Sequence, residues 1–178
     1  MIDEKLSYPI GRYGEGQVLD GSARESGLSD IEILPRSLRA VFANLSDEHL
    51  ETPYREGGWT ARQVIHHIAD SHINSFVRFS LALTEETPEI RPYAEDKWAE
   101  LPDHAMDPEV SLGLIEGIHA RWVGLLRSIS IDQFERKLVH PESGIWNLNG
   151  FIALYAWHGK HHLAHLEIIS RSKTPNEF

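Results

Sequence analysis

Residues 57–83, with the sequence GGWTARQVIHHIADSHINSFVRFSLAL, carry the clearest helix signal in the chain. Two glycines break the preceding segment, and Thr60 with Gln63 has the spacing of a capping box, in which two side chains satisfy N–H groups at the start of a helix. Apolar residues then recur at helical intervals along one face. The stretch predicts a long amphipathic helix that begins at Thr60, runs to about Leu83 and ends before Pro88.

Three further segments show the same apolar periodicity. They span about 29–45, 107–129, and from Asn147 or Asn149 to about Arg171. Ser29 and Glu32 have capping-box spacing, which places the first helix start near Ser29, and Pro35 lies close enough to that start to be tolerated. Asp107 followed by Pro108 predicts an N-cap and a first helical position.

The connections between these helices differ in length. Residues 88–108 form a long, proline-containing crossover, and residues 134–146 are rich in turn formers that fit either a hairpin or a plain loop. Four long helices, one long crossover and no convincing sheet predict an all-α four-helix bundle.

The domain organisation follows from this pattern. At 178 residues the chain has the length of one domain. We expect the bundle to span residues 28–172, with a frayed tail at 173–178. Residues 1–27 are rich in glycine, serine and charge, so we expect an extended N-terminal arm without a helix.

Composition excludes several classes of function. Seventeen Lys and Arg against 27 Asp and Glu give a net charge of −10, which would repel the phosphates of nucleic acid. Cysteine is absent, so the chain forms no disulfide or thiolate metal site and has no cysteine nucleophile. No apolar run resembles a signal peptide or is long enough to cross a membrane, and we expect a soluble cytoplasmic protein.

Histidine is concentrated in two of the predicted helices. The chain has 11 His, several of them in HHIADSH (66–72) and WHGKHHLAH (157–165). On a helical wheel His158 and His162 straddle the centre of the apolar face, His165 faces inward one turn further on, and His161 lies at the edge. Two imidazoles four residues apart can bind one metal ion. The alternative is that both are core histidines held by hydrogen bonds, but two unpaired imidazoles are costly in a dry core, and this favours metal.

A third ligand would have to come from the other histidine-rich helix. His72 falls in the middle of that helix's apolar face, and His67 falls at its border. His67 begins a polar stripe with Ser71, Asn74 and Arg78, which either lines a cavity or forms a solvated flank. Periodicity leaves His67 and His72 both open as the third ligand.

The motifs GGWTARQVIHHIADSH and WHGKHHLAH resemble those of the DinB-like superfamily of metal-binding four-helix bundles. YPIGRY (8–13), TPYREGGWT (52–60), LTEETPEIRPY (83–93) and YAWHGKHHLAH (155–165) resemble the YfiT-like branch of metal-dependent hydrolases, and the similarity runs from about residue 6 to 171. The resemblance implies one metal ligand on the second helix, at His67, and two on the fourth, at His158 and His162. It also favours a homodimer, in which the apolar groups of the arm would pack on the bundle or on a second subunit.

Three neutral imidazoles suit one divalent ion per subunit, with zinc as the first choice and nickel as an alternative. Such a site keeps open positions, and zinc can bring the pKa of bound water to roughly 7, which favours hydrolysis of a small-molecule substrate. Asp70, Asn74 and Arg78 are the candidates for other cavity residues, and no general base is assigned.

Two other hypotheses use the same ligands. In the first, the metal holds a small thiol cosubstrate such as bacillithiol for S-transfer, because the chain has no cysteine of its own. In the second, the metal only stabilises a non-catalytic binding module, and a fourth protein ligand fills the site.

Overall fold

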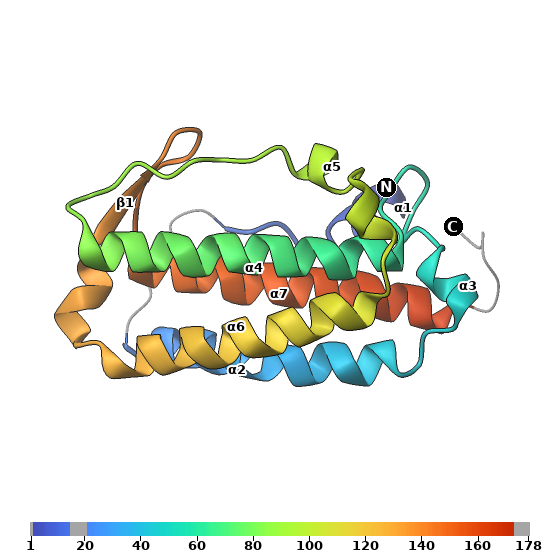
Figure 1. The fold of residues 1–178 in the computed structure, drawn as a ribbon, viewed down its shortest axis with the longest axis horizontal. Helices are drawn as coiled ribbons and strands as arrows, with labels where there is room; N and C mark the ends of the chain where they lie inside the picture. The colour runs from blue at the N-terminus through green and yellow to red at the C-terminus, as the bar shows by residue number, and fades with distance from the viewer. Residues whose placement is uncertain (1, 15–20, 173–178) are drawn as a thin grey trace.

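The computed structural model describes residues 2–14 and 21–172 and confirms the four-helix bundle. The long helices are α2 (Gly21–Phe42), α4 (Ala61–Thr84), α6 (Pro108–Ser128) and α7 (Leu148–Arg171). They run side by side (Figure 1). Helices α2 and α4 each pack on both α6 and α7, which closes the bundle around one interior.

The long crossover sets the direction of the helices. After α4 the chain returns along the bundle through α5 (Glu95–Trp98) and η1 (Pro102–Ala105), so that α4 and α6 run in the same direction (Figure 1). The antiparallel strands β1 (Lys137–His140) and β2 (Gly144–Asn147) follow η2 (Ile131–Glu135). Residues 134–146 therefore contain a hairpin.

The hairpin holds the start of the crossover. The Ile90 N–H donates to the Val139 carbonyl at 2.9 Å, and the Val139 N–H donates to the Pro88 carbonyl at 2.9 Å. Two short helices, α1 (Ile2–Ser7) and α3 (Asp47–Leu50), complete the described elements.

The expected caps of three long helices are confirmed. Thr60 and Gln63 form both hydrogen bonds of a capping box at α4. The Asp107 side chain accepts from the Glu109 N–H at the start of α6, and the Asn147 side chain caps α7. These caps satisfy N–H groups that have no partner within the helix.

The expectation of an arm without helix is wrong at both of its ends. Residues 2–7 form α1, and α2 begins at Gly21 rather than near Ser29. A β-carbon on Gly27 would lie 2.8 Å from Cγ2 of Ile152, so glycine allows α2 to extend against α7. Tertiary packing thus outweighs the low helix propensity of this glycine-rich segment. The predicted tail at 173–178 lies outside the described residues.

Pro35 also lies elsewhere than expected, in the interior of α2. Proline has no N–H, so the Ile31 carbonyl four residues earlier has no helical donor. The His119 ring on α6 supplies one, because its Nδ1 lies 2.7 Å from that carbonyl oxygen. A break in the helical hydrogen bonding of α2 is therefore used to hold a buried histidine.

The core is divided along the bundle into two apolar clusters. One contains Phe79, Trp122 and Phe151, and the other contains Ile65 and Leu166. On α6 and α7 the buried histidines lie in sequence between the members of the two clusters, and so does His72 on α4, whereas His66 and His67 lie next to Ile65 and Ile68 at the border of the second cluster. Histidine is thus concentrated in a polar layer across the middle of the bundle, where burial without partners would be costly.

Candidate metal centre

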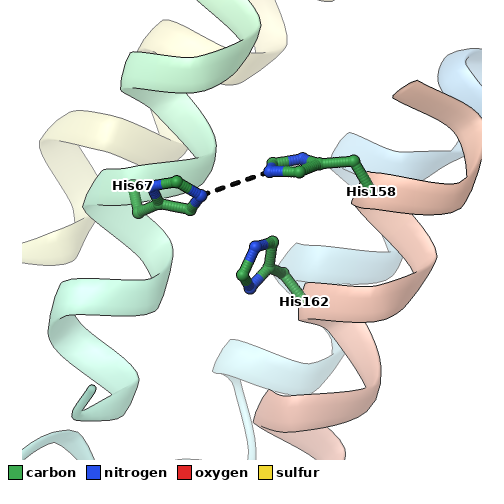
Figure 2. Close-up of side chains that lie close together, drawn as sticks. All are labelled: His67, His158 and His162. Atoms are coloured by element: carbon green, nitrogen blue, oxygen red, sulfur yellow. Dashed lines mark hydrogen bonds between the residues drawn. The ribbon is translucent and has the colours of Figure 1, made fainter. Parts of the chain in front are cut away.

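Three histidines from two neighbouring helices meet in this polar layer. His67 projects from α4, and His158 and His162 project from successive turns of α7 (Figure 2). Each contributes a ring nitrogen, and the three nitrogens lie within 4.8 Å of one another. Packing of α4 on α7 brings together the pair favoured by the helical wheel and the third residue implied by the family resemblance.

The spacing of the ring nitrogens fits a tetrahedral metal. Nε2 of His67 lies 3.2 Å from Nε2 of His158. Zinc–nitrogen bonds of about 2.0–2.1 Å at tetrahedral angles place two ligand nitrogens about 3.3 Å apart. The distance between these two nitrogens thus matches the distance expected between two nitrogens bound to the same zinc ion. Three imidazoles are also a set of ligands that zinc uses.

A chain of buried histidines fixes which nitrogen of His158 is free. Because the Ile31 carbonyl can only accept, Nδ1 of His119 carries the proton and Nε2 accepts. Nδ1 of His72 lies 2.8 Å from that Nε2 and donates to it. Nε2 of His72 is then the acceptor for Nδ1 of His158, at 3.1 Å. His158 is left with its Nε2 lone pair facing His67.

A shorter chain acts in the same way on His162. Nε2 of His165 lies 3.0 Å from the Leu6 carbonyl of α1 and donates to it, so Nδ1 of His165 is the acceptor. Nδ1 of His162 makes a longer contact with that nitrogen, at 3.4 Å. This arrangement leaves Nε2 of His162 without a proton. Partners of this kind orient metal-binding imidazoles and set their tautomer.

Burial keeps the three rings neutral. It lowers the pKa of His67 to about 3, and it lowers the pKa of His158 and His162 well below the ordinary histidine value. Neighbouring imidazoles lower these pKa values further. A metal ion requires unprotonated nitrogen, so the ligands are ready to bind at neutral pH without loss of a proton.

A second group of histidines lies next to the first. His161, His162 and His165 also have ring nitrogens within 4.8 Å of one another. His161 is buried rather than at the edge of the helix face, with 7% of its surface exposed, and its ring stacks on Trp157. Since Nδ1 of His162 faces His165 with its proton, the hydrogen-bond pattern favours the first group as the metal site.

The first group opens into a cavity of about 350 Å³. Aromatic side chains form much of its wall, and the lining residues are Trp59, His67, Ser71, Arg78, Glu95, His140, Ser143, Phe151, Leu154, Tyr155, Trp157, His158, His161 and His162. The polar stripe of α4 therefore reaches the cavity through Ser71 and Arg78. The Ser71 hydroxyl lies 3.5 Å from Nε2 of His158.

The other candidates from the stripe lie elsewhere. Asp70 accepts a hydrogen bond from Nε2 of His104 on η1 at 3.0 Å and is absent from the lining of this cavity. Asn74 donates to the Asp70 carbonyl and lines a separate pocket with Tyr93 and Trp98. His72 is fully buried and touches the triad only through His158.

Several lining residues were not predicted from the sequence. Trp59 precedes the N-cap of α4, and its ring centroid lies 4.5 Å from that of His67. Its position next to a strong helix start was a usable signal. His140 and Ser143 come from the hairpin and Glu95 comes from the crossover, and only the tertiary fold brings them to the cavity.

The chain matches proteins of one family over most of its length. A family model for the DinB superfamily matches residues 30–166. A Bacillus cereus (strain 03BB102) protein named "Putative metal-dependent hydrolase" is 48% identical over 161 residues, which cover 90% of this chain and 93% of the relative. A protein of Bacillus thuringiensis subsp. konkukian (strain 97-27), named in the same way, has the same identity and coverage.

Solved structures show the same fold. YfiT from Bacillus subtilis, described as a probable metal-dependent hydrolase with an unusual four-helix bundle topology, matches with a TM-score of 0.90 at 46% identity, covering 94% of this chain and 97% of that chain. The mycothiol-dependent maleylpyruvate isomerase matches with a TM-score of 0.66 at 20% identity, covering 80% of this chain and 60% of that chain. Among the described residues, no helix is both long and apolar enough to cross a membrane.

Proposed function

The chain belongs to the DinB superfamily, and we propose that it is a metal-dependent hydrolase whose single divalent ion is held by His67, His158 and His162. The observation that carries the proposal is the convergence of ring nitrogens from three buried, neutral histidines in the wall of one cavity. Zinc is the ion that the donor set fits best, and nickel is the alternative.

The protein's own residues prepare the site in three ways. The two histidine chains present Nε2 lone pairs from His158 and His162. Trp59 packs on the ring of His67 and restricts its movement. When bound, an ion with three protein ligands retains open positions and supplies a Lewis acid that lowers the pKa of water to about 7.

A divalent ion at this site would keep its full charge and would polarise a bound carbonyl group. The three ligands are neutral imidazoles, so they cancel none of the charge of a divalent ion. The cavity wall also holds a carboxylate, Glu95, and a guanidinium, Arg78. A polarisable ester or amide carbonyl of a small molecule fits a site with this charge and volume.

Ligand replacement tests the metal site. We expect His158→Ala and His162→Ala to lose most bound zinc after dialysis, because each removes one of three ligands. His161→Ala on the same helix is the matched control and should retain about one zinc ion per chain, measured by atomic emission. Stoichiometric zinc in the dialysed His158→Ala protein would contradict the assignment.

The reaction class needs a second experiment. Zinc-loaded and nickel-loaded protein would be assayed on a panel of ester and amide substrates in buffer alone, and on an alkyl halide with bacillithiol. The proposal expects turnover of at least one ester or amide without thiol, abolished in His158→Ala. Turnover only in the presence of the thiol would replace hydrolysis with S-transfer.

A further inference from the structure

Arg78 is a buried cation in the wall of the cavity that contains the histidine triad, about 16 Å along the axis of α4 from His67. It lies on α4 eleven positions beyond His67, close to the same face of the helix, and has 8% of its surface exposed. Its side chain lines the cavity together with all three histidines. Tyr155 lies next to the triad, with its ring centroid 5.7 Å from that of His158.

The guanidinium is bonded only to neutral groups. Nη1 of Arg78 donates to the Tyr155 hydroxyl at 3.3 Å, and Nη2 donates to the Arg91 carbonyl at 3.2 Å. Within the described part of the chain no carboxylate lies within ion-pair distance of it, and the carboxylate of Glu95 attracts it only from a longer distance. Arginine has five N–H donors and cannot lose its charge in a protein, so three donors remain to be satisfied and no anion is in direct contact with the charge.

A charge buried in this way is costly unless an anion pairs with it. Of the described residues that line the cavity, Arg78 is also the only Lys or Arg, and Glu95 adds a negative group to the same wall. One cation beside a carboxylate matches a monoanion better than a phosphate dianion. A planar guanidinium matches a carboxylate through paired hydrogen bonds.

We propose that Arg78 binds the carboxylate of the substrate, so that the enzyme acts on small carboxylic acids with a hydrolysable ester or amide at the opposite end. This inference rests on the proposed hydrolase function for the reacting end. The apolar side chains of Phe151 and Leu154 line the same cavity and fit the apolar body that would join the two groups. A cavity of about 350 Å³ limits the substrate to a small molecule.

Two-headed probes test this arrangement. Dicarboxylic acid monohydroxamates, from succinic to suberic, carry a metal-binding hydroxamate at one end and a carboxylate at the other. Each is compared with the analogue in which a carboxamide replaces the carboxylate, by calorimetric titration of zinc-loaded, full-length protein. We expect at least one chain length to prefer the acid by roughly tenfold or more, because charge-assisted hydrogen bonds are the strong ones.

Variants assign that preference to Arg78. Arg78→Gln should remove it, and Arg78→Lys should keep part of it through its charge. Arg121→Gln, which changes an exposed arginine on α6, is the control and should leave it intact. The wild-type comparison remains decisive if Arg78→Gln fails to fold. Equal binding of acid and amide at every length, or an undiminished preference in folded Arg78→Gln, would overturn the proposal.

Metal-free protein separates the two proposals. Without zinc both members of each probe pair should bind more weakly, but their ratio should persist because the carboxylate contact does not involve the metal. If zinc strengthens neither probe while the ratio persists, the metal site is wrong and the Arg78 subsite stands. If zinc strengthens both equally and no ratio appears, the metal site stands and the Arg78 subsite is wrong.

Discussion

Replacing His72 tests whether the buried histidine chain sets the metal affinity. In His72→Phe the ring volume is nearly kept, but Nδ1 of His158 loses the acceptor that lies 3.1 Å away. Binding through Nε2 then requires a buried N–H without a partner on Nδ1, which costs about 1–3 kcal/mol. We expect zinc affinity to fall by roughly 5- to 150-fold, a range that includes the usual effect of such outer partners.

The matched variant is His72→Gln, whose amide oxygen can accept from His158 while its NH₂ group donates to His119. We expect it to bind zinc within a few-fold of the wild type. Affinities would be measured by competition with a chromophoric chelator, and circular dichroism would confirm that both variants are folded. Wild-type affinity in folded His72→Phe would refute the tautomer argument, and equally weak binding by both variants would assign the effect to packing.

Three further predictions concern stability and assembly. Burial lowers the pKa of His119 to about 4. Below about pH 6.5 the unfolded chain therefore binds a proton that the native metal-free protein does not, and the free energy of unfolding decreases as the pH is lowered. Between pH 8 and 5 this residue should account for about 2 kcal/mol of lost stability. In urea unfolding, this loss between pH 8 and 5 should be absent from His119→Gln and present in His49→Gln. Identical pH dependence of the unfolding free energy in the two variants would contradict the prediction. Gly159→Ala should destabilise the protein by about 1 kcal/mol or more, because the new β-carbon would lie 2.6 Å from Cδ2 of buried Leu34. Gly117→Ala on α6 has open space around it and should stabilise the protein by up to ~1 kcal/mol, so thermal melts that shift in the same direction for both would be inconsistent with this packing. Light scattering at micromolar concentration should give the mass of a homodimer, weakened by deletion of residues 1–14, and a clean monomer mass would contradict this.

Local signals in the sequence predicted the bundle and most of its helix ends. Thr60, Asp107 and Asn147 cap their helices through side-chain contacts only two or three residues away, so the sequence contains the whole interaction. The start of α2 could not be found in this way. It depends on close packing of Gly27 against Ile152, which lies far away in the sequence.

In the candidate site, too, the sequence identifies some residues and only the tertiary fold identifies the others. Helical spacing singles out His158 and His162, because both lie on one face of one helix. Periodicity could not choose between His67 and His72, since both face the interior, one toward the cavity and the other toward His119 on α6. The link from the missing N–H of Pro35 to His119 requires knowledge of which helices are neighbours.

Anomalous diffraction from crystals of the zinc-loaded protein, recorded at the zinc absorption edge, tests the metal site most directly. We expect one peak per chain, about 2.0–2.1 Å from ring nitrogens of His67, His158 and His162, with at least one further position taken by solvent. A peak among His161, His162 and His165, or a fourth protein ligand that closes the coordination shell, would contradict the assignment of an open catalytic site.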